Sequence, residues 1–338
     1  MRVKGLTTAS RIISQIRNYS WYFPFLVWTH RYDRRGVKPG LTALILSLAV
    51  RPRSFSIIYR RWLATRLPPE ASNIEPDGGA IELLIVSHSK DFVTLPTCIK
   101  AAVASSLNTV SDIVVVVPDL DVQACQDLLI LHDLQAKVVA ETSLLPEALV
   151  GDLKSSFGGA RHGWILQQLL AVSHCLRSES KGVLLVDADT ILTHPRSWIN
   201  SSGVQPLLVS SEYTPDYYAF LEEIGVGSNP PKHTFVTHHM LFQPEVFREL
   251  LGGLSVDGFL GELGRQITDS RDRGRAAFCV EFELYAQHLL KAHPSRYQLV
   301  KFANRPVYGE FAAGQMVREA QNRQGVFSSV SFHAYLRS

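Results

Sequence analysis

Short apolar runs alternate with amphipathic segments from residue 80 onward, and this alternation constrains the fold more than any other feature. Ile81–Ser87 is an expected strand. Asp112–Val117 and Gly182–Val186 are continuous apolar or β-branched runs, a pattern typical of strands that are buried on both faces. Alternation of such strands with helices predicts an α/β fold with a mostly parallel sheet flanked by helices. The remaining expected elements are helices at Val93–Ser106, Val122–His132, Trp164–Leu176, Pro244–Leu251 and Phe282–Lys291 and strands at Ala136–Ala140, Pro206–Ser210 and Thr234–Phe242.

Composition narrows the class of protein. The chain has 338 residues, of which 46% are hydrophobic and 19% charged, as suits a globular protein of one large or two ordinary domains. Its four cysteines are scattered without the spacing of a zinc site or a disulfide framework. We therefore expect a reducing, cytoplasmic location.

The net charge of +3 hides a strong asymmetry between the two ends of the chain. Residues 1–69 carry 13 Lys and Arg against one acid, Asp33, whereas the rest carries 21 basic and 30 acidic residues. The segment 69–79 is rich in Pro, Gly and acidic residues, which is typical of a linker. We expect a basic, aromatic-rich helical extension at 1–68, a linker at 69–79 and one enzyme domain at 80–338.

The basic extension has two competing interpretations. Its Trp, Tyr and Arg residues suit the headgroup layer of an anionic membrane, so residues 1–66 could bind the inner face of the membrane peripherally. The longest apolar run, Leu41–Val50, is shorter than the ~20 residues that span a bilayer, and no signal-peptide cleavage site follows it. The alternative is a helical cap on the main domain with solvated arginines. No nucleic-acid-binding motif appears, so no nucleic acid is expected as a partner.

The segment Val183–Leu192 reads VLLVDADTIL, so a buried strand delivers two carboxylates, Asp187 and Asp189, at its carboxyl end. Residues two apart in an extended chain point the same way. Two adjacent carboxylates repel each other unless a cation joins them, and their hard oxygen atoms suit Mn²⁺ or Mg²⁺. A metal there would neutralise a diphosphate and stabilise it as a leaving group. The other interpretation is that one Asp caps the next segment and the other is solvated.

Two enzyme families fit this string. Haloacid-dehalogenase-like phosphatases carry Asp-x-Asp-x-Thr after the first strand of their core, with a later acidic pair at a strand end. Asp187 and Asp189 match its two aspartates, and Thr190 stands one position before the place of its threonine. In this chain, about 100 residues of alternating strands and helices precede the motif. The nearby candidate for the later acidic pair, Thr268–Asp272, does not follow an apolar run and so is not at the end of an expected strand. Both points favour the second family, the glycosyltransferases of the GT-A fold, in which Asp-x-Asp follows the fourth strand.

Four further segments carry that second resemblance: IELLIVSHSKD at 81–91, RHGWILQQLL at 161–170, VEFELY at 280–285 and SFHAYLRS at 331–338. With them, the body resembles nucleotide-sugar glycosyltransferases of the GT-A (Rossmann-like) fold, and most of all a little-characterised bacterial group of glycosyltransferase-like proteins.

The resemblance implies roles for residues on the donor side. The loop after the first strand would hold the nucleotide through Ser87, His88 and Asp91. Asp189 would ligate the metal with a late histidine, His333, and Asp187 would contact the ribose or the donor sugar. Arg161 would contact phosphate or sugar, and Arg337 would contact the diphosphate, since guanidinium forks match phosphate oxygens.

Other residues are expected on the acceptor side. GT-A enzymes often place an acid at the start of a late helix, and Glu281 and Glu283 both offer one. They point about 200° apart on a helix, so only one can face the pocket, and we favour Glu281 as base or acceptor anchor. A solvated helix-start carboxylate is the alternative. The remaining acceptor-side candidates are Trp164, Gln168, His238 and His239.

Together these features predict a hexosyltransferase that depends on Mn²⁺ or Mg²⁺. It would move a sugar from a nucleotide-sugar donor to a glycan or lipid-linked acceptor. The donor is expected to be UDP-linked because UDP-sugars are the common donors of the family that the chain resembles. Two alternatives remain open: a phosphatase that uses Asp187 as nucleophile, and a non-catalytic membrane-associated interaction protein.

Overall fold

The computed structural model describes residues 66–68, 79–308, 313–322 and 327–333, except residue 276 and the side chains of residues 160, 313 and 333. The expected extension at 1–68 and linker at 69–79 therefore lie almost wholly outside the described residues, as does Arg337. Within the described part, Leu67 packs against the main core, and the Lys301 amide donates to the carbonyl oxygen of Pro68 (2.8 Å).

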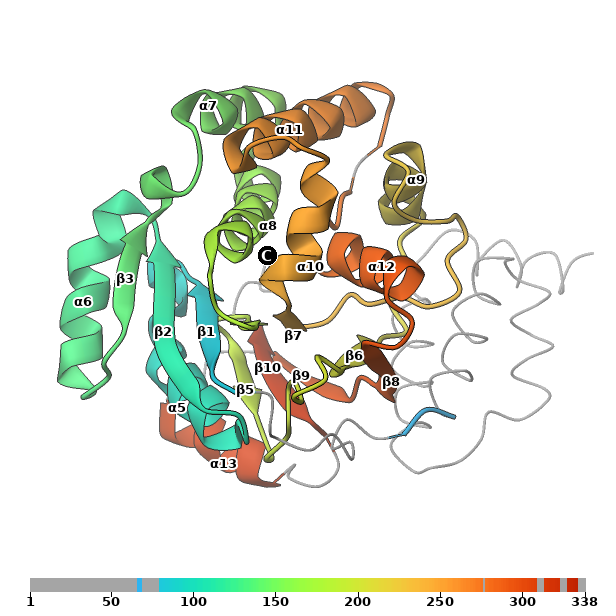
Figure 1. Cartoon of the computed structure of the whole chain (residues 1–338). Helices are drawn as coiled ribbons and strands as arrows, with labels where there is room; N and C mark the ends of the chain where they lie inside the picture. Colours follow the sequence, from blue (N-terminus) through green and yellow to red (C-terminus); the bar gives the residue numbers. More distant parts are fainter. Residues whose placement is uncertain (1–65, 69–78, 276, 309–312, 323–326, 334–338) are drawn as a thin grey trace, which may run out of the picture. The chain divides into compact units, whose positions relative to one another are not determined.

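A five-stranded sheet forms the centre of the described body, in the order β3-β2-β1-β4-β7 (Figure 1). Its first four strands in chain order pair in parallel, and β7 runs antiparallel to β4. The strands are β1 (Ile81–Val86), β2 (Val110–Val117), β3 (Lys137–Ala140), β4 (Val183–Val186) and β7 (His239–Phe242). The expected α/β fold with a mostly parallel sheet flanked by helices is confirmed.

Alternate side chains of β1 point to opposite faces of this sheet. Leu84 and Val86 belong to the larger core, which also contains buried residues of the helices α7, α8, α11 and α12. Leu83 and Ile85 point to the smaller core beneath α5 and α6. Because both faces are covered, β1 has no exposed apolar side chain, which explains why all of its residues except Glu82 are apolar. The helices are α5 (Leu95–Ser105), α6 (Val122–Leu131), α7 (Glu147–Ser156), α8 (Gly159–Arg177), α9 (Pro215–Glu223), α10 (Pro244–Arg248), α11 (Val256–Asp272), α12 (Phe282–Ala292) and α13 (Ala313–Asn322).

Two smaller sheets extend the body beyond β4. In one, β10 pairs antiparallel with β5 and parallel with β9; in the other, β6 and β8 pair in parallel. These strands are β5 (Thr190–Leu192), β6 (Gln205–Val209), β8 (Tyr297–Lys301), β9 (Asn304–Tyr308) and β10 (Ser329–His333). They bring the end of the described chain back beside the segment that follows β4.

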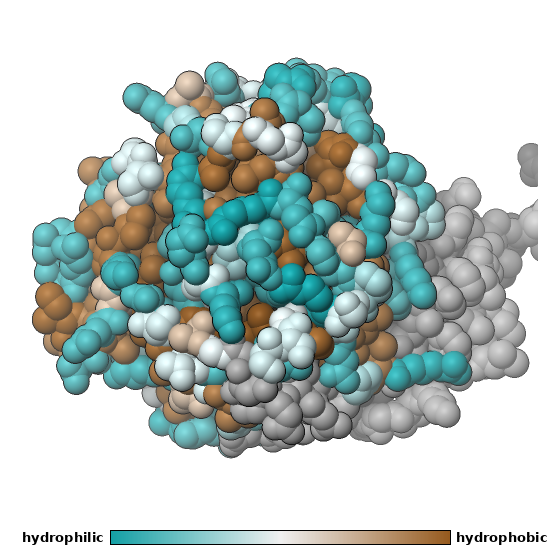
Figure 2. Space-filling model, in the orientation of Figure 1, coloured by the Kyte–Doolittle hydropathy of each residue, from teal (hydrophilic) through white to brown (hydrophobic). Residues whose placement is uncertain are grey.

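The three most exposed large hydrophobic residues of the described body lie at one edge of the sheet. These residues are Leu120, Ile130 and Leu131, and Figure 2 shows a hydrophobic area over α6 at the left of the molecule. This edge lies beside β3, at the opposite end of the sheet from β7. Among the described residues, no helix combines the length and apolar character that crossing a bilayer requires.

Candidate active site at the carboxyl ends of β1 and β4

The order of the strands marks the place where a ligand is expected. The chain proceeds outward from β1 to β2 and β3, then returns to add β4 on the other side of β1. In open α/β sheets, ligands bind at such a reversal, in the crevice beyond the carboxyl ends of the two strands. Leu84 pairs with Leu185, so the residues after β1 and β4 are neighbours. Ser87–Asp91 and Asp187–Asp189 thus meet at the reversal point.

Asp187 is held by His238, the residue just before β7. The Asp187 amide donates to the His238 carbonyl (2.9 Å), and His238 Nδ1 lies 2.9 Å from Asp187 Oδ2. Burial acts to lower the pKa of His238, but the hydrogen bond and charge of Asp187 outweigh it and raise that pKa. The antiparallel pairing of β7 with β4 creates this contact. His238, expected on the acceptor side, is therefore a direct partner of the first carboxylate.

Asp189 lies against the last described strand. The Phe332 amide donates to the Asp189 carbonyl (2.8 Å), and the Thr190 and Ser331 hydroxyls are 2.9 Å apart. Strand β10 therefore passes directly beside the Asp-x-Asp turn. The side chain of His333, the expected second metal ligand, lies outside the described residues, but its backbone follows Phe332 in β10.

A buried threonine fastens the loop after β1 to the Asp-x-Asp turn. The Thr94 hydroxyl, with its single proton, lies within hydrogen-bond distance of the carbonyl oxygens of Asp91 (2.7 Å) and Ala188 (2.8 Å). Burial raises the pKa of Asp91 to about 6, and the negative charges of Asp189 and Asp187 add to the rise. Asp91, which the sequence predicts on the donor side, is thus within electrostatic reach of both motif carboxylates.

The two other candidates after β1 differ in their surroundings. The Ser87 side chain is 5% exposed, and its hydroxyl makes no hydrogen bond among the described residues. His88 is exposed, with its Nδ1 3.1 Å from the Ser89 hydroxyl and 3.8 Å from Asp121 Oδ2. A buried hydroxyl without a partner is costly unless a ligand or water satisfies it, so Ser87 suits a ligand-binding position.

Glu281 lies at the start of α12 and is close enough to Asp187 to feel its charge. Its side chain is 7% exposed, and burial, followed by the charge of Asp187, raises the pKa of Glu281 well above its usual range. Gln168 of α8 positions the segment before it, because its amide accepts from the Val280 amide (2.8 Å) and donates to the Phe278 carbonyl (3.2 Å). We expected Gln168 on the acceptor side; its amide is instead buried and engaged by backbone.

Glu283 also differs from its expected place at the acceptor side. It is fully buried, and its carboxylate accepts hydrogen bonds from the Tyr218 hydroxyl (2.6 Å), the Phe235 amide (2.5 Å) and the Gln287 amide (3.0 Å). These contacts tie α9 and the segment before β7 to α12. The carboxylate is therefore used inside the protein.

The remaining candidates are dispersed. Arg161 is exposed in the first turn of α8, and Trp164 packs beside Tyr217 with ring centroids 6.0 Å apart. His239 is fully buried between the aromatic rings of Trp198 and Phe302, away from its expected acceptor-side place. Successive side chains along an extended segment point to opposite sides, so His239 points into the core whereas His238 points to Asp187.

Sequence reasoning missed several residues around the carboxylates. Asp121 follows β2 and accepts from the Ser89 amide (3.1 Å), so the strand-end rule that selected Asp187 would have found it. Cys98 Sγ lies 3.4 Å from the Asp187 carbonyl, and Glu212 interacts electrostatically with His238. Neither Cys98 nor Glu212 belongs to a local pattern that could have placed it here.

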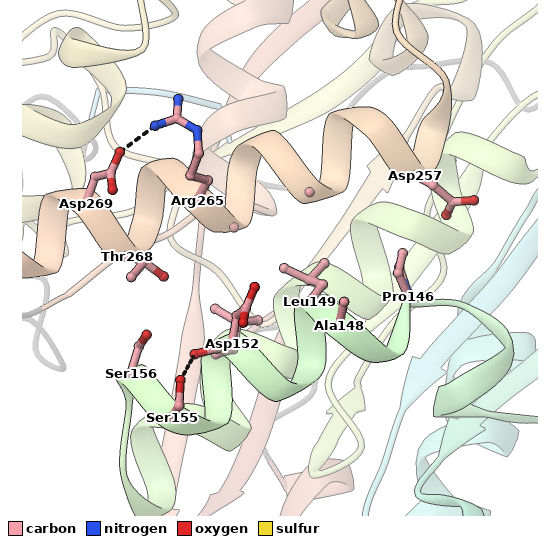
Figure 3. A pocket seen from close by; sticks show the side chains of 13 residues that line it. Pro146, Ala148, Leu149, Asp152, Ser155, Ser156, Asp257, Arg265, Thr268 and Asp269 are labelled. Carbon is pink, nitrogen blue, oxygen red and sulfur yellow. Dashed lines mark hydrogen bonds and ion pairs between the residues drawn. The ribbon is translucent and has the colours of Figure 1, made fainter.

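A groove of ≈ 390 Å³ lies elsewhere, between α7 and α11 (Figure 3). Leu149 and Asp152 line it from α7, and Arg265 and Asp269, joined by an ion pair, line it from α11. None of its lining residues is one of the carboxylates at the ends of β1 and β4. The groove therefore does not coincide with the strand-end site.

Comparisons with known proteins give a consistent but distant likeness. A model of a family of unknown function (DUF6492) matches residues 98–201, which contain β2, β3, β4 and the Asp-x-Asp turn. No curated protein matches the sequence. Among solved structures, mouse xyloside xylosyltransferase 1 in its apo form is 12% identical, with 76% of this chain and 98% of that chain covered and a TM-score of 0.40.

Two further solved structures are also glycosyltransferases. The galactosyltransferase LgtC in complex with donor and acceptor sugar analogues is 10% identical, with 75% and 87% covered and a TM-score of 0.42. The mannosyltransferase Ktr4p from S. cerevisiae is 10% identical, with 72% and 77% covered and a TM-score of 0.46. The chain is thus similar to glycosyltransferases over about three quarters of its length. At such identities and scores, its function has to be inferred from the residues of its own site.

Proposed function

We propose that the protein is a metal-dependent glycosyltransferase that transfers a hexose from a nucleotide-sugar donor, UDP-linked by the sequence resemblance, to a glycan or lipid-linked acceptor. One observation carries the proposal: Asp187 and Asp189 follow β4 at the reversal point of the sheet, beside the polar loop after β1. The donor's nucleotide would lie against Ser87, His88 and Asp91, and its diphosphate toward Asp189.

The acidic cluster fits a hard divalent cation. Burial and the charges of the motif carboxylates raise the pKa of both Asp91 and Glu281. Several acidic groups are therefore close together in a partly buried site. Oxygen ligands of this kind suit Mn²⁺ or Mg²⁺. Asp189 would hold the ion, with His333 as a second ligand from β10. When bound, the ion would stabilise the departing diphosphate.

Asp187 has a separate task in this proposal. His238 beside it carries a raised pKa, and the hydrogen bond of its Nδ1 fixes the direction of the Asp187 carboxylate. An ionised carboxylate in a fixed orientation is a strong acceptor for a ribose or sugar hydroxyl. Asp187 would therefore orient the donor.

Glu281 is the proposed base or acceptor anchor. Its raised pKa means that the carboxylate, once ionised, binds a proton strongly, which suits removal of the acceptor hydroxyl proton. Gln168 would act as a positioning residue, because it fixes the backbone leading to Glu281. Arg161 and Arg337 are the proposed phosphate contacts, and Trp164 remains a candidate on the acceptor side.

The proposed class of acceptor rests on the basic, aromatic-rich composition of the N-terminal region. Residues 1–66 would bind an anionic membrane surface peripherally on its cytoplasmic side, which would bring the enzyme to a lipid-linked or membrane-associated acceptor. An acidic glycan is the other acceptor that these arginines suit.

The test is nucleotide release from a panel of sugar nucleotides, with Mn²⁺, Mg²⁺ or EDTA. Wild type should hydrolyse one donor slowly in the presence of metal. Asp189→Asn should lose about 100-fold or more of that rate, the usual scale for removing a group that stabilises developing charge. Asp152→Asn, an exposed aspartate of α7, is the matched control and should retain the rate.

The phosphatase alternative has less support. Its expected second acidic pair, Thr268–Asp272, lies within helix α11, whereas that family needs the pair at a strand end. Failure of the protein to bind any donor by calorimetry, together with cleavage of a generic phosphomonoester that needs Asp187, would establish the phosphatase and refute the transferase. Full biological function of Asp187→Asn would favour the non-catalytic alternative.

A further inference from the structure

A second group of metal-binding side chains lies outside the strand-end site. Glu249 is in the 3₁₀ turn η4 (Glu249–Leu251), His288 is in the last turns of α12, and His293 directly follows that helix. The Nε2 atoms of His288 and His293 each lie 2.9 Å from Glu249 Oε2. One ligand atom from each of the three residues lies within 4.8 Å of the other two.

The end of α12 makes this convergence possible. Residues five apart on a continuous helix point about 140° apart, so His288 and His293 would face different ways if the helix went on. The helix instead ends at Ala292, and His293 adopts φ −131° and ψ 64°. Its amide still donates to the Leu289 carbonyl (2.9 Å), so the turned residue is held to the helix.

The backbone on the Glu249 side is fixed by the core. Phe247, two residues earlier, is fully buried against Tyr285 of α12, with ring centroids 5.4 Å apart. Arg248 donates through Nε to the Leu176 carbonyl (3.0 Å). After η4 the chain turns at Gly252, whose φ of +57° favours glycine. The three side chains are thus presented by two segments that cannot easily separate.

We propose that Glu249, His288 and His293 form a site for a divalent transition metal of the zinc class. Two imidazoles and one carboxylate are ligands that zinc accepts, and a fourth position would be left for water. Tetrahedral bonds of ~2.0–2.1 Å separate ligand atoms by about 3.3 Å, so small side-chain rotations would admit the ion.

The electrostatic state of the group suits a cation. Partial burial acts to raise the pKa of Glu249, but hydrogen bonds from His293 and His288 outweigh it and lower that pKa. The carboxylate is therefore ionised at neutral pH. An ion bound at Nε2 would leave no proton on that atom: a neutral ring would carry its single proton on Nδ1, and a charged ring would release one proton to solvent.

The ion would join the end of α12 to η4. Because the same helix begins next to Glu281, a fastened far end would limit movement of the whole helix. The site is independent of the proposed transferase activity, since none of its three residues contacts the strand-end carboxylates in the part of the chain that the structure describes.

The experiment is a calorimetric titration of the full-length protein with Zn²⁺, in excess Mg²⁺ to occupy hard-oxygen sites. Each of His293→Gln, His288→Gln and Glu249→Gln should weaken one Zn²⁺-binding event at least tenfold. His132→Gln, a histidine at the end of α6, should leave it unchanged. The transition temperature should rise with Zn²⁺ in wild type and in His132→Gln, and less or not at all in the three variants.

A spectroscopic readout makes the test independent of stability. Co²⁺ bound by two imidazoles and a carboxylate absorbs visible light, and this band should be present in wild type and absent from the three variants. Identical Zn²⁺ isotherms and Co²⁺ spectra for wild type and all three variants would overturn the proposal. Loss of donor hydrolysis in Asp189→Asn with an unchanged Co²⁺ band would separate this site from the transferase site.

Discussion

The buried carboxylate of Glu283 gives a prediction with a calculable size. Burial raises the pKa of Glu283 from 4.5 to about 7, although the three hydrogen bonds that it accepts oppose the shift. In the unfolded chain the same group ionises near 4.5. The folded protein therefore holds a proton that the unfolded chain releases between these two values, and folding becomes less favourable as pH rises through them.

The size of the effect follows from the two pKa values. Each pKa unit corresponds to about 1.4 kcal/mol, so the contribution of Glu283 is fully present below pH 4.5 and about 3 kcal/mol is lost above pH 7. Between pH 5.5 and 7.5 the free energy of unfolding should fall by about 2 kcal/mol from this group alone. In Glu283→Gln, a neutral side chain of the same length, this part of the pH dependence should disappear.

The assay is urea unfolding at pH 5.5 and 7.5, followed by tryptophan fluorescence. Wild type and Glu147→Gln, which changes an exposed glutamate of α7, should lose the same stability between the two pH values. Glu283→Gln should lose about 2 kcal/mol less. Parallel changes in all three proteins would refute the reasoning, because they would mean that Glu283 is already ionised in the folded state at pH 5.5.

Three further predictions concern the site and the extension. Asp187→Asn should lower the pKa of His238, since burial would then act without the opposing carboxylate; NMR titration of the ring measures it, and an unchanged pKa would contradict the pairing. Thr94→Val should lower the free energy of unfolding by about 1–3 kcal/mol, because the buried Ala188 carbonyl loses the hydroxyl that donates to it, whereas the Asp91 carbonyl keeps the Thr94 amide (3.0 Å); denaturant unfolding would reveal this loss, and no loss would mean that water replaces the hydroxyl. Arg34→Gln with Arg35→Gln in the full chain should reduce co-sedimentation with anionic vesicles and not with neutral ones; equal binding to both would argue against the membrane role.

The sequence was most informative where one local rule decides the structure. Apolar runs identified β1, β2 and β4 to within two residues, because strands covered on both faces need apolar side chains at most positions. The motif carboxylates could be placed for the same reason, since they directly follow a buried strand. Helix geometry also allowed one prediction about α12: Glu281 and Glu283 face different ways, and only Glu281 interacts electrostatically with Asp187.

The rest depends on contacts between distant parts of the chain. His238 reaches Asp187 only because β7 adds antiparallel to β4, and β10 passes Asp189 from more than 140 residues away. The helix α11 has an apolar face, but we did not predict the helix because its sequence contains several glycines and charged residues. Glu249 and His288 share no local motif, so their meeting depends on how α12 packs on α10.

The position of β1 in the sheet has a consequence for altering this protein by design. The strand is hydrogen-bonded on both sides and covered on both faces, so a change within it would disturb β2, β4 and two cores at once. The turn that follows is polar and largely exposed. New ligand preferences are therefore best sought by exchanging residues 88–91, with Phe92 kept because it packs against the smaller core, and Thr94 kept because it joins this turn to the rest of the site.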